Sequence, residues 1–203
     1  MLTYMLPTRL AIANLCRPKR HASVSFAANA VNSLDYLPRV TGSIAVARAL
    51  ISYEYLWGAI RVQGGAYGAG FIRRNNGLIG YYTYRDPDAA RSLGVFSEVG
   101  DFLRSFAQSG EELTTYIIGA LGDSDPILTP KVISVLSMSA YLRGETFEDR
   151  VRYREELLGT TGEDLMALAD VIDKISIDGA AVVVGGRDKL EACGDKLKKI
   201  IEL

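Results

Sequence analysis

The alternation of apolar and polar residues predicts strands near both ends of the chain and a block of helices between them. Period-two alternation and short apolar runs indicate strands over residues 23–32, 69–74, 78–85 and 180–186. Helical spacing indicates helices over residues 42–60, 89–109, 111–121, 130–143, 146–158, 165–174 and 187–203. Strands placed before and after a helical block are typical of an α+β fold rather than an alternating βαβ fold.

Short polar signals predict where several of these elements begin or turn. Thr41, Asp88 and Thr129 are expected to cap helices, because their side chains can accept hydrogen bonds from the free amides of a first turn. The run Thr161-Gly162-Glu163-Asp164 has the spacing of a capping box. Between two predicted strands, Asn75-Asn76-Gly77 favours the positive φ angles of a tight hairpin.

The length of 203 residues suits one large domain or two small ones, and the sequence shows no linker or internal repeat. Residues 1–22 have no sustained period, and Pro7 and Pro18 would break a helix, so we expect a poorly structured lead-in before a single domain over 23–203. No Asp or Glu precedes Asp35, although basic residues do. Such a start fits an organelle transit peptide or an internal start. The localisation of this soluble chain is therefore open between the cytoplasm and an organelle matrix.

The composition argues against several classes of function. A hydrophobic content of 48% is sufficient for a buried core. The formal net charge of −1 gives no general attraction to nucleic acid or to an anionic membrane. The sequence has no run of 18 apolar residues, so no membrane-spanning helix is predicted.

The sequence shows no catalytic or metal-binding motif. His21 is the only His, so a His-x-x-Glu-His zinc helix, which needs two, is excluded and a lone surface His is favoured. Cys16 and Cys193 match no metal spacing and are interpreted as structural thiols. Val184-Gly185-Gly186 lacks the motifs of phosphate-binding loops. Turn and helix-start roles account for the acidic residues Glu111, Glu112, Asp123 and Asp125.

The most distinctive stretch covers residues 55–70. It contains the only Trp and five of the 20 Gly residues. We expect Leu56 and Trp57 to anchor this stretch in the core. The Gly64-Gly65 pair permits positive φ angles or a close approach between backbone segments.

Arg61 and Tyr67 flank that glycine pair, where the predicted helix gives way to a predicted strand. Two interpretations are open from the residues alone. The first is an ordinary exposed Arg with a core Tyr, and the second is a pair of side chains that reach outward from one strand edge.

A family resemblance favours the second interpretation. The run Arg61-Val62-Gln63-Gly64-Gly65-Ala66-Tyr67-Gly68, within residues 53–70, resembles the C-terminal half of presequence-protease-like enzymes, which belong to the insulinase/pitrilysin family of zinc metallopeptidases. The similarity spans roughly residues 23–190. Further similar stretches follow in the same order: Tyr84-Arg85-Asp86-Pro87, Ile117-Ile118-Gly119, Asp125-Pro126, Thr129-Pro130, residues 152–158 and Glu163-Asp164-Leu165.

The resemblance implies a fold and a division of labour. The implied fold is a two-layer sandwich of a mixed, largely antiparallel sheet packed on helices, the mitochondrial-processing-peptidase-like metallohydrolase fold. In this family two similar halves close around a chamber, and the N-terminal half holds zinc. The C-terminal half has no metal and supplies an Arg and a Tyr to the bound peptide, which correspond to Arg61 and Tyr67, with Gly64 and Gly65 between them. The strand after Gly65 is expected to pair with an extended peptide.

These 203 residues do not contain the zinc-bearing half. The resemblance therefore implies a substrate-binding, non-catalytic half of a zinc metalloendopeptidase that degrades unstructured peptides. No metal is expected in this chain, and its partners are a zinc-bearing half, in a longer chain or a separate subunit, and the peptide substrate. The alternative is an inactive family member that acts as a structural or interaction subunit.

Overall fold

The computed structural model describes residues 9–13, 23–124 and 128–202 of the chain. These residues form a six-stranded sheet in the order β3-β4-β2-β5-β1-β6. Adjacent strands in the series β3-β4-β2-β5 run antiparallel, whereas β1 runs parallel to both β5 and β6. The mixed, largely antiparallel sheet that we expected is therefore confirmed. The strands are β1 (Arg9–Ala13), β2 (Phe26–Asn32), β3 (Gly68–Arg73), β4 (Leu78–Tyr84), β5 (Ala180–Gly185) and β6 (Ile200–Glu202).

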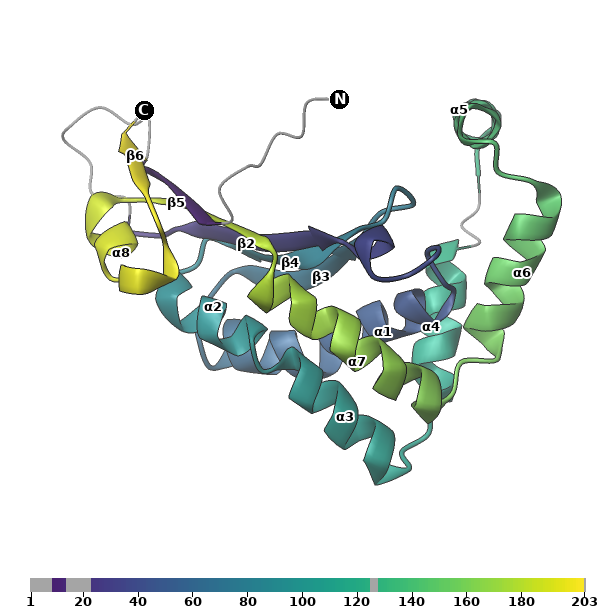
Figure 1. Ribbon diagram of the computed structural model, residues 1–203, viewed down its shortest axis with the longest axis horizontal. Coiled ribbons are helices and arrows are strands. Elements are labelled where there is room, and N and C mark those ends of the chain that lie inside the picture. Colours follow the sequence, from purple (N-terminus) through teal and green to yellow (C-terminus); the bar gives the residue numbers. More distant parts are fainter. Residues whose placement is uncertain (1–8, 14–22, 125–127, 203) are drawn as a thin grey trace.

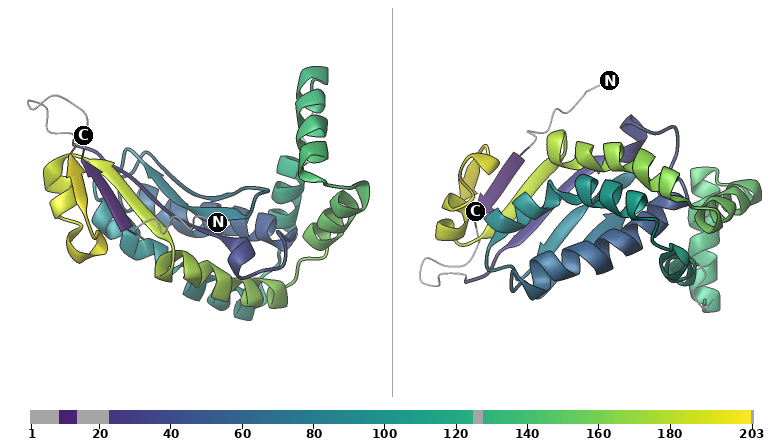
Figure 2. Two further views of the ribbon diagram at one scale, coloured as in Figure 1. Left: turned by 45° about the horizontal axis from the view of Figure 1, so that its top comes forward. Right: turned by 90° about the horizontal axis from the view of Figure 1, so that it is seen from below.

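Helices cover one face of this sheet and make the second layer (Figures 1 and 2). The elements beneath the sheet are α1 (Ser43–Leu50), η2 (Ile51–Val62), α2 (Ala89–Phe96), α3 (Val99–Ser109) and α7 (Gly162–Ile177). At one end of the layer, α4 (Thr114–Ser124) and α6 (Phe147–Leu158) pack against α1. Beyond them α5 (Pro130–Arg143) stands apart from the body (Figure 2). Short pieces complete the described chain: η1 (Ser33–Asp35), α8 (Arg187–Glu191) and η3 (Gly194–Lys196).

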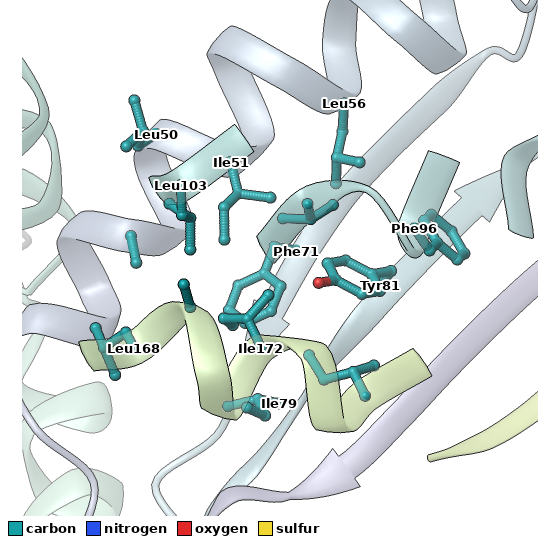
Figure 3. Close-up of a cluster of buried hydrophobic side chains, with 14 of the residues drawn as sticks. Leu50, Ile51, Leu56, Phe71, Ile79, Tyr81, Phe96, Leu103, Leu168 and Ile172 are labelled. Carbon is teal, nitrogen blue, oxygen red and sulfur yellow. The ribbon is translucent and has the colours of Figure 1, made fainter. Parts of the chain in front are cut away.

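The main core lies between the sheet and the helical layer (Figure 3). Phe71 of β3 and Tyr81 of β4 point from the sheet into it, and their rings lie 5.4 Å apart. Leu56 of η2 and Ile172 of α7 meet them from the helices, and both are almost fully buried. Burying a large apolar side chain contributes about 1.5–3 kcal/mol, so this layer contact dominates the stability of the fold.

Most helix starts agree with the sequence prediction. The side chains of Asp88 and Thr129 cap α2 and α5, and Thr161 and Asp164 form the expected capping box of α7. The prediction that Thr41 caps a helix is wrong, because α1 begins after Gly42, which has no capping side chain. The Gly42 amide instead donates to Glu156 Oε2 of α6 at 3.0 Å, so a residue distant in sequence performs the capping.

Two predicted helices are broken in the structure. The helix expected over 89–109 is interrupted between α2 and α3. The prediction of a helix over 187–203 is wrong after α8. Gly194 takes a φ of 50°, and the chain then enters β6. Ile200 and Ile201 of β6 pair with β1, a contact over nearly 190 residues that the lysine-rich local pattern did not reveal.

Part of the expected lead-in is a strand. Arg9–Ala13 forms β1, because its five residues fit between β5 and β6 in parallel register. The other residues of that segment, His21 and Cys16 among them, lie outside the described residues. The two interpretations of the acid-poor start, a transit peptide and an internal start, fall on this same segment. Cys193 is buried, which raises the pKa of its thiol and agrees with a structural role.

Candidate functional site

The turn between η2 and β3 places Arg61 and Tyr67 on neighbouring backbone. Arg61 lies at the end of η2, and its carbonyl oxygen accepts a hydrogen bond from the Gly65 amide at 3.0 Å. The Ala66 amide donates to the Ile60 carbonyl at 3.2 Å. The chain therefore reverses tightly, and Tyr67 follows directly as the residue before β3.

The expected helix over 42–60 changes its winding in the middle, and this decides which side chains face outward. From Ile51 onward it is a π-helix, in which the Gln63 amide donates to the Gly58 carbonyl five residues back at 3.0 Å. Stretches of π-helix occur frequently at functional sites. The wider turn puts Leu56 and Ile60 in the core and turns Trp57 outward, with 42% of its surface exposed.

Our prediction for Leu56 is thus confirmed, and the one that placed Trp57 in the core is wrong. The Trp57 ring instead supports Arg61, whose guanidinium carbon lies 3.9 Å from the ring centroid. A cation held over an indole face is attracted by the negative face of the π-system. Trp57 therefore orients Arg61 at the surface.

Contacts from two helices hold η2 in place behind these residues. Arg91 of α2 donates from Nη1 to the Ala59 carbonyl at 2.7 Å. Tyr55 donates its hydroxyl to Glu98 Oε2 at 2.7 Å, and burial together with this hydrogen bond raises the pKa of Tyr55. Tyr55 therefore stays protonated at neutral pH as a donor, and the end of η2 is fixed to the helical layer.

The glycine pair has the roles expected from the sequence. A Cβ at Gly64 would lie 2.5 Å from the Ile60 carbonyl oxygen and 2.7 Å from Arg91 Nη1, so no side chain fits there. Gly65 has a φ of 75°, a left-handed conformation that glycine adopts without a steric penalty. Each glycine satisfies one of the two alternatives, close approach at 64 and positive φ at 65.

Tyr67 points away from the core, with 66% of its surface exposed. Its amide donates to the Arg85 carbonyl at 3.4 Å, which extends the β3–β4 pairing by one residue. Its ring meets the Tyr84 ring edge-on at 5.9 Å, and Tyr84 in turn meets Phe26 at 5.3 Å. An aromatic row therefore runs from Tyr67 across β4 to β2.

This row belongs to the sheet face opposite the helical layer. The register puts Tyr84 beside Gly68, Tyr82 beside Ala28, and Phe26 beside Val184. Among the described residues, no helix covers this face (Figures 1 and 2). Exposed apolar and aromatic surface of this kind is typical of sites that bind another molecule.

The outer edge of β3 is only partly available for strand pairing. Within the part of the sheet that the structure describes, β3 is a terminal strand with β4 as its one neighbour. The Phe71 amide, however, donates to Ser52 Oγ of η2 at 3.1 Å. The strand pairing expected after Gly65 is therefore restricted to the end of β3 that begins at Gly68.

Comparisons with known proteins show where this domain belongs. The family described as the PreP C-terminal domain matches residues 14–186. The chain belongs to this family. Presequence protease 1 of Arabidopsis thaliana is 35% identical over 182 residues, covering 89% of this chain and 17% of its own length. The mitochondrial presequence protease of Xenopus laevis is 30% identical over 154 residues, with coverages of 74% and 15%.

The chain spans less than a fifth of the length of these curated relatives. Solved structures confirm the expected fold. Pitrilysin matches with a TM-score of 0.60 at 12% identity, covering 97% of this chain and 22% of its own. The inactive domain of a Pseudomonas fluorescens M16 peptidase matches with a TM-score of 0.57 at 12% identity, covering 88% and 43%.

Two kinds of feature are not found in the described part of the chain. Among those residues, no group of three or more His, Cys, Asp and Glu side chains is arranged to hold a metal ion. No helix within the same ranges is long and apolar enough to cross a membrane. The side chains around the turn offer a hydroxyl, a guanidinium and aromatic surface.

The sequence prediction missed the supporting and aromatic residues of this site. Alternation in β4 separates Tyr82 and Tyr84 from Tyr81, but it does not say which face lacks helices. Phe26 comes close to Tyr84 only through the pairing of β2 with β4. The exposure of Trp57 follows from the π-winding, which has no sequence signal of its own.

Proposed function

We propose that this chain is the substrate-binding, non-catalytic half of a zinc metalloendopeptidase that degrades unstructured peptides. The observation that carries the proposal is one tight turn that holds a half-buried Arg61 and an exposed Tyr67 beside the aromatic face of the sheet. A fully buried Arg or Tyr would have a structural role, whereas both of these side chains reach solvent. The peptidase family of the relatives agrees with this role.

An unstructured peptide can use both parts of this surface. The end of β3 near Gly68 can offer main-chain hydrogen bonds to an extended segment, which gives affinity without sequence preference. The aromatic row through Tyr84 can bury apolar side chains of the peptide. A folded substrate has few free main-chain groups, so the surface favours unfolded ones.

The two side chains on the turn have distinct proposed roles. Arg61 presents a planar fork that can grip a peptide carbonyl or carboxylate. Tyr67 can donate its hydroxyl to the oxygen of the scissile carbonyl, where negative charge develops in the transition state. Both groups assist a reaction but neither can activate water, so cleavage requires groups from elsewhere.

Zinc would be that missing component, held by a partner half. The described residues offer no ligand cluster for it, so the metal does not fit that part of the chain. The zinc-bearing half would belong to the same longer chain or to a separate subunit. The proposal predicts no activity for this chain alone and activity when the two halves are combined.

The test is cleavage of an unstructured peptide by this chain mixed with a zinc-bearing half of a relative. Activity that needs both halves, and that falls by at least about tenfold with Arg61→Ala, supports the proposal. Arg150→Ala on α6 is the control, because Arg150 is a solvent-exposed arginine on a helix remote from the turn. Full activity of the Arg61→Ala assembly would exclude the assigned role.

A structural or interaction subunit is the second candidate, and α5 favours it. This helix exposes apolar side chains on several sides: Val132, Ile133, Val135, Leu136, Met138, Tyr141 and Leu142. A helix that is apolar all round needs a covering surface. If the chain is only a scaffold, it assembles with a partner stably, and added peptide leaves the Tm of the assembly unchanged.

A further inference from the structure

Arg85 lies directly after β4 and has an unusual backbone. Its φ is 49°, and among the described residues it is the only non-glycine residue with a positive φ. Glycine and asparagine enter this left-handed region at lower cost than arginine, because glycine has no Cβ to crowd the following carbonyl oxygen and the short side chain of asparagine can form a local hydrogen bond. Strained residues of this kind persist where the surroundings force them, and they cluster at ligand-binding sites.

Hydrogen bonds on both sides of Arg85 fix this conformation. Before the bend, the Arg85 carbonyl accepts from the Tyr67 amide at 3.4 Å. After it, Asp86 is buried and exchanges two backbone hydrogen bonds with Ser25, at 2.7 and 2.8 Å. Lys189 then donates to the Pro87 carbonyl at 2.7 Å. The backbone is therefore held independently of what the Arg85 side chain does.

The guanidinium of Arg85 has no structural use in this arrangement. Its side chain is exposed, and no hydrogen bond or ion pair of its guanidinium is present among the residues the structure describes. Neither adjacent acid pairs with it: Asp86 is buried, with Oδ1 accepting from the Asp88 amide at 2.9 Å and Oδ2 unpartnered in the described chain, and Asp88 caps α2. An exposed arginine in a strained position thus lacks a partner among the described residues.

Its position places that charge beside the proposed peptide site. Tyr67 and Arg85 lie opposite each other on adjacent strands, and such strands are about 4.8 Å apart. Arg61, the other cation of the turn, contacts Trp57 and likewise has no acidic partner in the described chain. The two arginines therefore stand near Tyr67 on separate backbone segments, and neither guanidinium is paired with an acid in the described chain.

We propose that Arg85 determines specificity by binding the carboxylate of an acidic side chain in the bound peptide. This inference rests on the proposed function, because it needs a peptide at Tyr67. A guanidinium matches a carboxylate through two parallel hydrogen bonds, which a neutral amide cannot reproduce with equal strength. Peptides with Asp or Glu at the position over Arg85 are thus bound more tightly than their amide counterparts.

The experiment compares Arg85→Asn with the unmodified chain on matched peptides. Asn tolerates the left-handed backbone and removes the charge, so Tm is expected to stay constant or rise slightly. The peptides form a set in which one Asp is moved through a neutral unstructured sequence, each with an Asn counterpart. Binding to this chain is measured by fluorescence anisotropy, and kcat/KM is measured with the zinc-bearing half present.

The expected result is a preference of about tenfold for Asp over Asn at one peptide position, lost in Arg85→Asn. Affinity for the Asn peptide is expected to be unchanged. Arg74→Asn is the control, because Arg74 is an exposed arginine at the opposite end of the same hairpin. It removes the same charge and is expected to keep the preference.

Three outcomes would overturn the inference. The first is no Asp preference of the unmodified chain at any position. The second is an equal loss of affinity for both peptides in Arg85→Asn, and the third is loss of the preference in Arg74→Asn as well. If the assembly binds these peptides but cleaves none, the peptidase role fails while the anisotropy still decides the role of Arg85. If peptides are cleaved without any Asp preference, the peptidase role survives and the role of Arg85 does not.

Discussion

The guanidinium carbon of Arg61 lies 3.9 Å from the centroid of the Trp57 ring, four residues earlier in the π-wound segment η2. The contact uses an exposed Trp to orient a half-buried Arg, in a part of the helix whose inner face is occupied by Leu56 and Ile60. Arg61 is thereby restricted before any peptide arrives. Such preorganisation lowers the entropic cost of binding.

Replacing Trp57 with Leu is expected to impair the site with little effect on folding. A cation–π contact at an exposed position is worth about 0.5–1 kcal/mol, so kcat/KM of the assembled peptidase should fall roughly two- to fivefold. A double-mutant cycle of Trp57→Leu with Arg61→Ala checks the mechanism. If Trp57 acts through Arg61, the loss from Trp57→Leu disappears in the Arg61→Ala background, and independent losses that multiply would contradict it.

Tyr67→Phe is expected to lower kcat while KM changes little. The variant keeps the ring that meets Tyr84 and removes the hydroxyl, which we assign to the developing oxyanion. Loss of one such donor costs about 10²–10³ in kcat. Steady-state kinetics of the assembled halves measure it, with Tyr141→Phe on α5 as the control for an exposed Tyr away from the site. An unchanged kcat would remove Tyr67 from the chemistry and leave it a binding residue.

Gly64→Ala and Gly58→Ala should change the free energy of unfolding in opposite directions. A methyl group at Gly64 would meet the Ile60 carbonyl oxygen at 2.5 Å, so this change should destabilise the fold by about 1–3 kcal/mol. At Gly58 nothing lies within 4 Å, and Ala should stabilise the helical backbone by up to about 1 kcal/mol. Urea unfolding of both variants measures the difference. Equal stabilities would show that the turn at Gly64 relaxes freely.

Glu156 is expected to link stability to pH. Its carboxylate pairs with Arg39 and accepts the Gly42 amide at 3.0 Å, which ties α6 to the start of α1. The hydrogen bond from Arg39, followed by that from Gly42, lowers the pKa of Glu156 below 4.5. A depressed carboxyl pKa stabilises the fold above about pH 4.5, and this contribution is lost as pH falls through the lower, folded-state pKa.

The free energy of unfolding of Glu156→Gln and of the unmodified chain, measured against urea at about pH 7 and about pH 3, tests this linkage. We expect a loss of about 1–2 kcal/mol in the variant at neutral pH, since Arg39 is partly exposed to solvent. The difference should shrink in acid. A difference that stays constant between the two pH values would show that the carboxylate charge is not what stabilises the contact.

Local signals in the sequence determined much of the secondary structure and the turn at the site. Capping by Asp88, Thr129 and Thr161 was predictable because each acts on amides within three residues of itself. The positive φ at Gly65 was predictable in the same way, because steric freedom belongs to the residue. The family motif added roles for Arg61 and Tyr67 that physical chemistry alone left open.

Only the tertiary structure decided which surfaces are exposed and which distant residues meet. The π-winding of η2 turned Trp57 out of the core, and pairing across the sheet brought Phe26 and Arg85 to Tyr84 and Tyr67. β1 and β6 formed only because each lies beside a strand far away in the chain. Caps and turns are governed by neighbouring atoms, whereas strand partners and uncovered faces depend on how the whole chain closes, so no local pattern encodes them.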